Sequence, residues 1–202
     1  MEKPTINGPK TMQKEHSTSF NLTDSYIYFS EKNKEDFFYD SLIYICEHDT
    51  GGAFGLIVNK PSRLSTRKLF KSLKLQIPNT INDFDRVMHG GPVDADKVFV
   101  IHDKETDSEF STKLADDLYL SSDAEILRRI SNQNNVGYKI FLGYCGWGAS
   151  QLEEEVKSGA WEILNISRQN IFYEKPAQLV DRISMEVGYN LRDISKGSNQ
   201  AH

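Results

Sequence analysis

The clearest hydrophobic pattern in the chain is a pair of apolar runs, Ser41–His48 and Ala53–Asn59, separated by Asp49–Gly52. Successive side chains of a β-strand point to opposite faces, and Gly51 and Gly52 supply the backbone conformations that a hairpin turn requires. The two runs are therefore predicted to form an antiparallel hairpin. Because the second run is apolar on both faces, it is predicted to lie at the centre of a sheet.

The predicted hairpin also places particular side chains next to one another. With the turn at Asp49–Gly52, Cys46 is expected to lie opposite Gly55 on the second strand. The side chains predicted to share one face of the first strand are Leu42, Tyr44, Cys46 and His48.

Shorter patterns predict further elements. The additional strands are Arg86–His89, Val98–His102, Leu118–Leu120, Tyr138–Leu142 and Trp161–Ile166. The expected helices are one through Ile126, Leu127 and Ile130 after Ser121 or Ser122, one from a Ser150–Glu153 capping box to about Gly159, and a last one over Gln178–Val187. Strands and helices do not alternate strictly, so the predicted class is α+β with a mixed, largely antiparallel sheet.

The two ends of the chain differ from the middle. Residues 1–19 and 195–202 are polar and lack hydrophobic periodicity, which is typical of disordered tails. Between them no linker or internal repeat interrupts the pattern. The predicted organisation is therefore a single domain over residues 20–194 with a tail at each end.

Charge limits the partners that the chain is expected to bind. The 202 residues include 24 Lys+Arg and 29 Asp+Glu, for a net charge of −5. Binding through nucleic-acid phosphates needs a basic face, so tight direct DNA binding is not expected. One basic stretch, on a short helix predicted to turn Leu64, Leu69 and Leu73 inward, is either a solvated helix face or a nucleic-acid contact. Its candidate contact residues are Lys60, Arg63, Arg67, Lys68 and Lys71.

Three further absences in the sequence bear on location. No run approaches the roughly 18–20 apolar residues of a membrane span, and residues 1–16 contain no apolar segment of a signal peptide. Two cysteines do not make a disulfide framework. The sequence therefore predicts a cytoplasmic protein in a reducing compartment, with no membrane partner.

Two glycine-rich segments are candidates for holding a small anion. Residues 143–148 (GYCGWG) are predicted to turn from a buried strand into a helix, where backbone N–H groups and the helix dipole can bind negative charge. A second turn is predicted at residues 89–92 (HGGP). Neither segment has the spacing of a dinucleotide fingerprint or a P-loop. The candidate ligand-binding residues are Gly90, Gly91, Gly143, Gly146, Trp147 and Gly148.

The thiols admit both structural and chemical interpretations. Cys145, at a predicted helix start, is a small structural residue, a redox-sensitive thiol with a lowered pKa, or a nucleophile. Cys46 and His48, two residues apart on one strand, are packing residues or a thiol–imidazole pair. Zinc would need two further ligands, and nothing in the sequence brings His89 or His102 to them. No metal site and no cofactor are therefore predicted.

Four ordered motifs together resemble the YqgE/AlgH family of bacterial proteins. The motifs are YICEH at residues 44–48, GAFGLIVNKP at 52–61, GGPV at 90–93, and LGYCGWG at 142–148 running into QLEEE at 151–155; Trp161 and residues 171–172 extend the match. The resemblance implies a bifurcated sheet rolled into a pseudo-barrel with flanking helices. It also implies a cytoplasmic protein of a family that is often labelled as transcriptional regulators and has no established enzymatic reaction.

Two positions depart from the family pattern. Residues 39–41 read Tyr-Asp-Ser where the family usually has Arg before the Ser, and Cys145 stands where Ala or Ser is frequent. The favoured hypothesis is a non-enzymatic regulatory or binding protein whose partner is a protein or a small anionic ligand. The alternatives are a thiol-based redox sensor or enzyme using Cys145 or Cys46, and a small-anion-binding pocket protein.

Overall fold

The computed structural model of the chain describes residues 20–79, 81–105, 109–123, 125–131, 136–173 and 175–194. The two predicted tails, residues 1–19 and 195–202, lie outside the described residues. None of the described helices is both long and apolar enough to cross a membrane.

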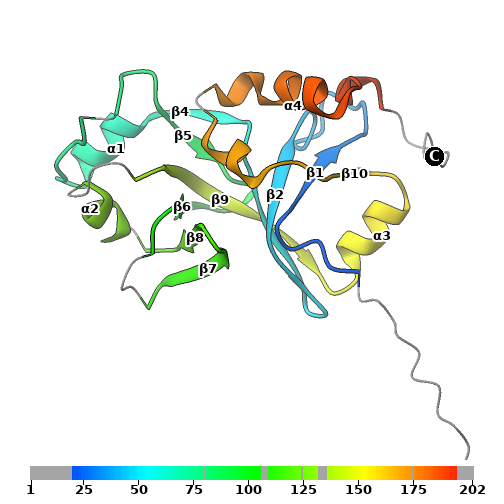
Figure 1. The fold of residues 1–202 in the computed structure, drawn as a ribbon, viewed down its shortest axis with the longest axis horizontal. Helices are drawn as coiled ribbons and strands as arrows, with labels where there is room; N and C mark the ends of the chain where they lie inside the picture. Colours follow the sequence, from blue (N-terminus) through cyan, green and yellow to red (C-terminus); the bar gives the residue numbers. More distant parts are fainter. Residues whose placement is uncertain are drawn as a thin grey trace, which may run out of the picture.

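A curled, mostly antiparallel sheet forms the body of the molecule (Figure 1). Its main path runs in the order β10-β1-β2-β3-β9-β6-β8-β7, and β5 joins β4 to β9 at one side. Of the described strand pairs, β5 with β9 is parallel and the others are antiparallel. The strands are β1 (Ser25–Phe29), β2 (Leu42–Asp49), β3 (Gly52–Ile57), β4 (Pro61–Ser65), β5 (Arg86–His89), β6 (Val93–His102), β7 (Ser111–Ala115), β8 (Leu118–Ser121), β9 (Tyr138–Gly148) and β10 (Trp161–Leu164).

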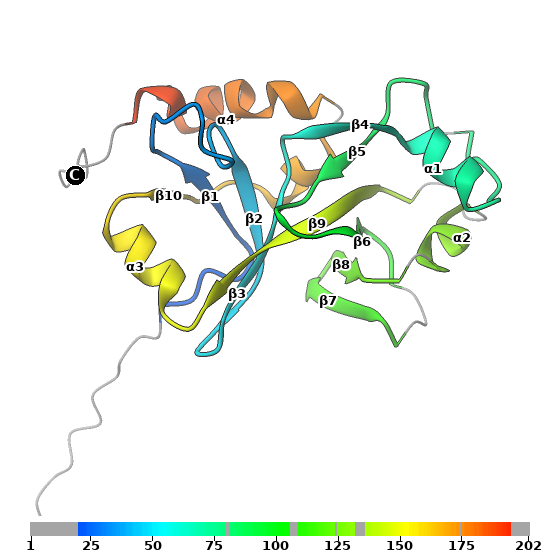
Figure 2. The same ribbon diagram turned by 180° about the vertical axis from the view of Figure 1, so that it is seen from behind.

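The longest strand, β9, divides the sheet into two branches. Its second half pairs with β3, whereas its first half pairs with β5 and β6. The branches diverge from this shared strand and curl into a half-barrel with a few helices (Figure 2). The predicted α+β class and largely antiparallel, bifurcated sheet are therefore confirmed.

The helices lie at the ends and along one side of the sheet. In Figures 1 and 2, α1 and α2 are at one end, α3 is at the other, and α4 runs along the rim. Their bounds are α1 (Thr66–Ser72), α2 (Glu125–Ser131), α3 (Gln151–Lys157) and α4 (Leu179–Val187), with 3-10 turns η1 (Arg168–Phe172), η2 (Pro176–Gln178) and η3 (Leu191–Asp193).

Three clusters of buried apolar side chains hold these elements together. The largest fills the half-barrel and includes residues from the C-terminal elements, such as Ile171, Ile183 and Leu191. A second lies beneath α3 around Trp161, and a third joins α1 to α2 through Phe70 and Leu127. Segments far apart in sequence thus share each core, and burial of their apolar surface fixes the arrangement.

The sequence patterns miss three strands and make two too short, β6, which was predicted from Val98 rather than Val93, and β9. β1, β4 and β7 were not expected, and β4 begins at Pro61, where the hydrophobic pattern predicts a stop. β4 pairs with β5 at only two positions, and β7 lies at the edge of the sheet. Apolar alternation is weak in both strands. The main error concerns β9, because residues 143–148 continue the strand that they were predicted to end.

Candidate functional site

The two glycine motifs meet where β9 passes the connection between β5 and β6. A Cβ atom at Gly90 would overlap the carbonyl of Gly143, and one at Gly91 would overlap the carbonyl of Tyr144. The Gly90 N–H donates to Leu142 O, and the Gly90 carbonyl accepts from the N–H of Ile57. The backbone of β9 therefore occupies the space beside Gly90 and Gly91 in which the sequence predicts a bound anion.

The glycine turn predicted at residues 143–148 is wrong, because each of these residues belongs to β9. Gly146, Trp147 and Gly148 pair with residues 52–54 of β3, away from the crossing at Gly143. The expected cap of α3 is wrong as well: Ser150 adopts a left-handed conformation and makes no side-chain cap. Instead, the Gly148 N–H donates to Oε1 of Gln151 at 3.0 Å.

The predicted thiol chemistry at Cys145 does not fit its position. Cys145 lies within a strand, is 1% exposed, and points its Sγ at the carbonyl of Gly90 at 3.4 Å. Burial raises the pKa of its thiol, and burial also raises the pKa of Cys46. The lowered pKa expected at a helix start is therefore wrong.

A β-bulge in β2 separates Cys46 from His48. Ile45, rather than the predicted Cys46, lies opposite Gly55, and pairing resumes with Glu47 opposite Phe54. The extra residue turns the following side chains to the other face. Cys46 consequently packs in the half-barrel core, whereas His48 lies opposite Ala53 on the side of α3. The predicted shared face is wrong, and so is a thiol–imidazole pair.

His48 instead joins three segments of the chain. Its Nδ1 accepts the N–H of Leu22 at 3.0 Å, and its Nε2 lies 3.2 Å from Oε1 of Glu153 on α3. Glu155, two residues further along the same helix, accepts the indole N–H groups of Trp147 at 2.9 Å and Trp161 at 2.7 Å. These glutamates fasten α3 to the sheet.

A serine–histidine pair lies in the opposite branch of the sheet. His102 is fully buried, with Nδ1 2.7 Å from Lys104 O and Nε2 2.9 Å from Oγ of Ser121. Because a carbonyl can only accept, Nδ1 carries the ring proton and Nε2 accepts from the serine hydroxyl. Burial is the main cause of the lowered pKa of His102. Since Ser121 is 1% exposed, the pair is closed to a substrate in this structure.

The basic candidates do not lie on one helix: Lys60 precedes β4, Arg63 lies on β4, and the other three lie on α1. Lys60 donates to the carbonyl of Phe37 at 2.6 Å, and Arg67 pairs with Asp83 at 2.8 Å. Arg63, Lys68 and Lys71 are exposed. The predicted inward Leu73 is 37% exposed, and Phe70 takes its place in the core.

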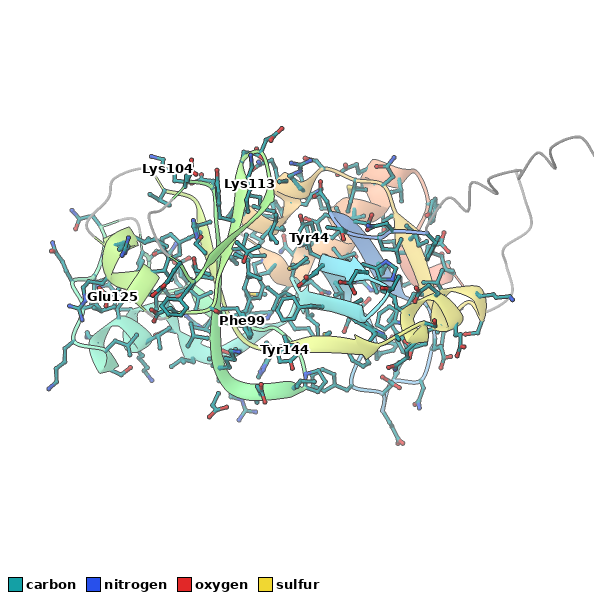
Figure 3. The ribbon with its side chains drawn as sticks, turned by 90° about the horizontal axis from the view of Figure 1, so that it is seen from below. Tyr44, Phe99, Lys104, Lys113, Glu125 and Tyr144 are labelled. Atoms are coloured by element: carbon teal, nitrogen blue, oxygen red, sulfur yellow. The ribbon has the colours of Figure 1, made fainter. Side chains whose placement is uncertain are left out.

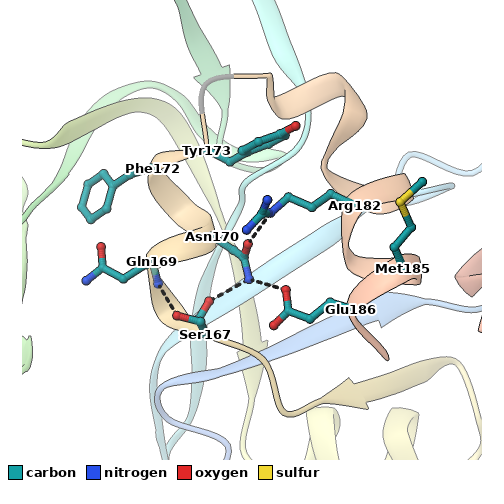
Figure 4. A pocket seen from close by; sticks show the side chains of 8 residues that line it. All are labelled: Ser167, Gln169, Asn170, Phe172, Tyr173, Arg182, Met185 and Glu186. Carbon is teal, nitrogen blue, oxygen red and sulfur yellow. Dashed lines mark hydrogen bonds between the residues drawn. The ribbon is translucent and has the colours of Figure 1, made fainter. Parts of the chain in front are cut away.

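No group of three or more His, Cys, Asp or Glu side chains within the described residues is placed to hold a metal ion. A hollow of about 770 Å³ does lie between η1 and α4, on the outer side of the C-terminal segment (Figure 4). Its lining residues are Ser167, Gln169, Asn170, Phe172, Tyr173, Arg182, Met185 and Glu186.

A guanidinium group is held in a fixed position in this hollow. Arg182 reaches from α4 across the hollow, and its guanidinium lies over the ring of Tyr173, 4.9 Å from the centroid. Its Nε donates to Oδ1 of the buried Asn170 at 3.1 Å, and Nδ2 of Asn170 donates to Glu186 at 3.3 Å. No other hydrogen bond of Arg182 is found among the described residues, so its terminal nitrogens remain available.

Sequence reasoning missed the hollow because its contacts are not local. Asn170 lies in a segment without hydrophobic periodicity, and its partners follow 12 and 16 residues later. The spacing of Arg182 and Glu186 by four residues was the one available signal, since it places both on one helix face.

Known proteins resemble the chain over most of its length. The profile of the AlgH-like family matches residues 27–192. A UPF0301 protein of Mesorhizobium japonicum is 33% identical over 188 residues, covering 89% of this chain and 93% of its own. A UPF0301 protein of Shewanella frigidimarina is 31% identical over 177 residues, covering 86% and 95%.

Two solved structures share the fold. The solution structure of the AlgH protein from Pseudomonas aeruginosa superposes with a TM-score of 0.69 at 26% identity, covering 93% of this chain and 98% of that protein. A crystal structure of a Corynebacterium diphtheriae protein gives a TM-score of 0.63 at 18% identity, covering 80% and 86%, and supports the fold alone. By the extent of the family match and the identity to its relatives, the chain belongs to the AlgH-like family.

Proposed function

We propose that the chain is a non-enzymatic binding protein with a regulatory role, and that the hollow between η1 and α4 receives its ligand. The observation that carries this proposal is the fixed guanidinium of Arg182, with its terminal nitrogens open to the hollow. A guanidinium that is already oriented binds a carboxylate or phosphate in two-point fashion with little loss of side-chain entropy. The ligand class is a small molecule bearing one such group.

The rest of the lining supports an anionic ligand with an apolar part. Phe172, Tyr173 and Met185 offer apolar surface beside the guanidinium, and Met185 is 84% exposed. Glu186 limits the negative charge that the ligand can carry. Its carboxylate accepts a hydrogen bond from Asn170, the same residue that holds Arg182, and so lies close to the guanidinium. A monoanion is therefore favoured over a more highly charged ligand.

A thermal-shift screen of carboxylates and phosphorylated metabolites tests the proposal. A ligand at about 100 times its Kd adds roughly 2.7 kcal/mol of stability, which raises the Tm of a domain of this size by roughly 5–10 °C. Arg182→Gln should remove the shift, whereas the matched variant Arg63→Gln, also an exposed arginine, should keep it. Glu186→Gln should increase the shift for a monoanion because it removes a negative charge.

A screen in which no compound raises the Tm would contradict the proposal. So would a stabilising compound whose effect persists in Arg182→Gln, because the ligand would then bind elsewhere.

A further inference from the structure

At the opposite end of the molecule from α3, the loop at residues 81–85 is held firmly by two arginines. Arg67 of α1 donates to the carbonyl of Ile81 at 2.9 Å and pairs with the carboxylate of Asp83 at 2.8 Å. Arg86 donates to the carbonyl of Asp83 at 2.7 Å. These contacts link the loop to both α1 and β5.

The same loop presents an aromatic ring to solvent. Phe84 is 85% exposed, the largest exposure among the exposed large apolar side chains of the described residues. Its N–H donates to Oδ1 of Asn82 at 2.8 Å, and the Asn82 N–H donates to Asp85 at 2.9 Å. A fixed loop therefore holds an apolar ring in water, and a partner that covers the ring pays little ordering entropy.

Lysines lie on the helix that this loop contacts. Leu69 and Phe70 of α1 face the core, and Lys68 and Lys71 are exposed on the other side. Arg67, which holds the loop, lies one turn before Lys71 on the same helix face. We group Phe84 with the two lysines as the α1 surface, because Asp83, the neighbour of Phe84, pairs with Arg67, the residue before Lys68.

Charge is strongly segregated around this surface. Residues 63–74, which include α1, contain five Lys or Arg and no acidic residue, which leaves 19 basic against 29 acidic residues in the rest of the chain. Figures 1 and 2 show α1 at one end of the elongated molecule and α3, with its three consecutive glutamates, at the other. A polyanion would therefore be attracted to the α1 end in preference to the α3 end.

We propose that the α1 surface binds single-stranded nucleic acid, with Lys68 and Lys71 contacting phosphates and a base stacking on Phe84. Proteins bind single strands through a basic track combined with aromatic rings on which bases stack. An anionic membrane fits less well, because membrane binding scales with the apolar area inserted into the lipid and Phe84 is a single exposed ring, whereas one ring is enough to stack one base. The inference does not depend on the hollow at η1 and α4.

Fluorescence anisotropy of the full chain with a labelled single-stranded oligothymidylate, titrated at several salt concentrations, tests this inference. The logarithm of the binding constant should fall linearly with the logarithm of salt. The double variant Lys68→Gln/Lys71→Gln should lower that slope by about 1.4, at about 0.7 for each phosphate contact. The matched double variant Lys32→Gln/Lys34→Gln removes the same charge from exposed lysines between β1 and β2 and should retain the slope.

The aromatic contact has a separate readout. Phe84→Ala should weaken binding by about five- to 100-fold while leaving the salt slope unchanged, because stacking releases no counterions. Tyr189→Ala, an exposed ring beyond α4, is its control and should bind as the unchanged chain does. Circular dichroism checks that each variant is folded.

Three outcomes would overturn the inference. The first is the lack of salt-sensitive binding to the oligonucleotide, and the second is an equal effect of the two lysine pairs. The third is binding to phosphatidylserine vesicles, but not to the oligonucleotide, that Lys68→Gln/Lys71→Gln abolishes, because the α1 surface would then recognise lipid.

Discussion

At the scale of the residue, His102 forms a serine–histidine pair of the kind found in active sites, but its contacts give it a structural role. Its two ring nitrogens are satisfied by Lys104 O and by Oγ of Ser121, and its ring stacks on Tyr119 at 5.7 Å between centroids. A charged ring could no longer accept the serine hydroxyl. The buried neutral form is therefore the one that the folded state holds.

This position predicts a particular dependence of stability on pH. Because the pKa of His102 is lowered in the folded state, its imidazole binds a proton more readily in the unfolded chain than in the folded protein. The contribution to stability is fully present above the unfolded value of about 6.5 and is lost as pH falls toward the folded pKa. Denaturant unfolding at about pH 7.5 and about pH 5 measures the loss.

The variant His102→Gln should lose less stability than the unchanged chain between these two pH values. His89→Gln, which changes an exposed histidine on β5, should retain the full loss. An equal loss of stability in the His102→Gln variant would show that groups other than His102 cause the fall in stability at acid pH.

At the scale of the element, the crossing of β9 over residues 90–91 explains why glycine is required there. Ala at position 91 would place its Cβ within the backbone of Tyr144. Neither segment can move without breaking the pairing of β9 to β3 and β6. Gly91→Ala is therefore expected to cost at least about 3 kcal/mol of unfolding free energy.

The matched change for this prediction is Gly148→Ala in the same strand. Its added Cβ would meet Oε1 of Gln151 at 3.9 Å, an ordinary van der Waals distance. Urea unfolding of both variants should therefore show a loss at least about 2 kcal/mol larger at position 91. Comparable losses at the two positions would argue against a close backbone crossing.

The elements also show what the sequence could and could not predict. The hairpin of β2 and β3 was predictable because its turn chemistry and apolar runs are local. The length of β9 was not, because glycine serves both turns and close backbone approach, and only the partner at residues 90–91 distinguishes them. The bulge at Cys46 has no local signal, yet it decides which face His48 occupies.

The candidate site was still less accessible to sequence reasoning. Every predicted ligand-binding glycine lies in β9 or beside it, whereas the hollow is built from η1 and α4. Its central residue, Asn170, is defined by partners on another helix rather than by its neighbours in the chain.

At the scale of the whole molecule, the shared strand predicts cooperative unfolding. β9 pairs with β3 in one branch and with β5 and β6 in the other, so neither core can open alone without disturbing it. Both tryptophans, Trp147 and Trp161, lie at the α3 end, so their fluorescence reports on that end, whereas far-ultraviolet circular dichroism reports on all elements. The two signals should give coincident denaturant transitions.

Separate midpoints would show that the branches unfold independently. Figure 3, in which the molecule of Figure 1 is seen from below, shows the labelled Tyr144 of β9 close to Phe99 of β6. Their rings lie 5.7 Å apart, and the ring of Phe54 on β3 lies 5.0 Å from that of Tyr144, so this aromatic cluster joins the two branches.

The place of β9 in the chain has a consequence for synthesis. Residues 138–148 are synthesised only when about three quarters of the chain has been made, yet they supply the central strand to which β3, β5 and β6 attach. Until then the nascent chain can form the hairpin of β2 and β3 but leaves apolar strand edges without partners. Such edges are where chains aggregate and chaperones bind. The fold can therefore be completed only late in translation, and the edges of β3, β5 and β6 that pair with β9 lack their partner until then.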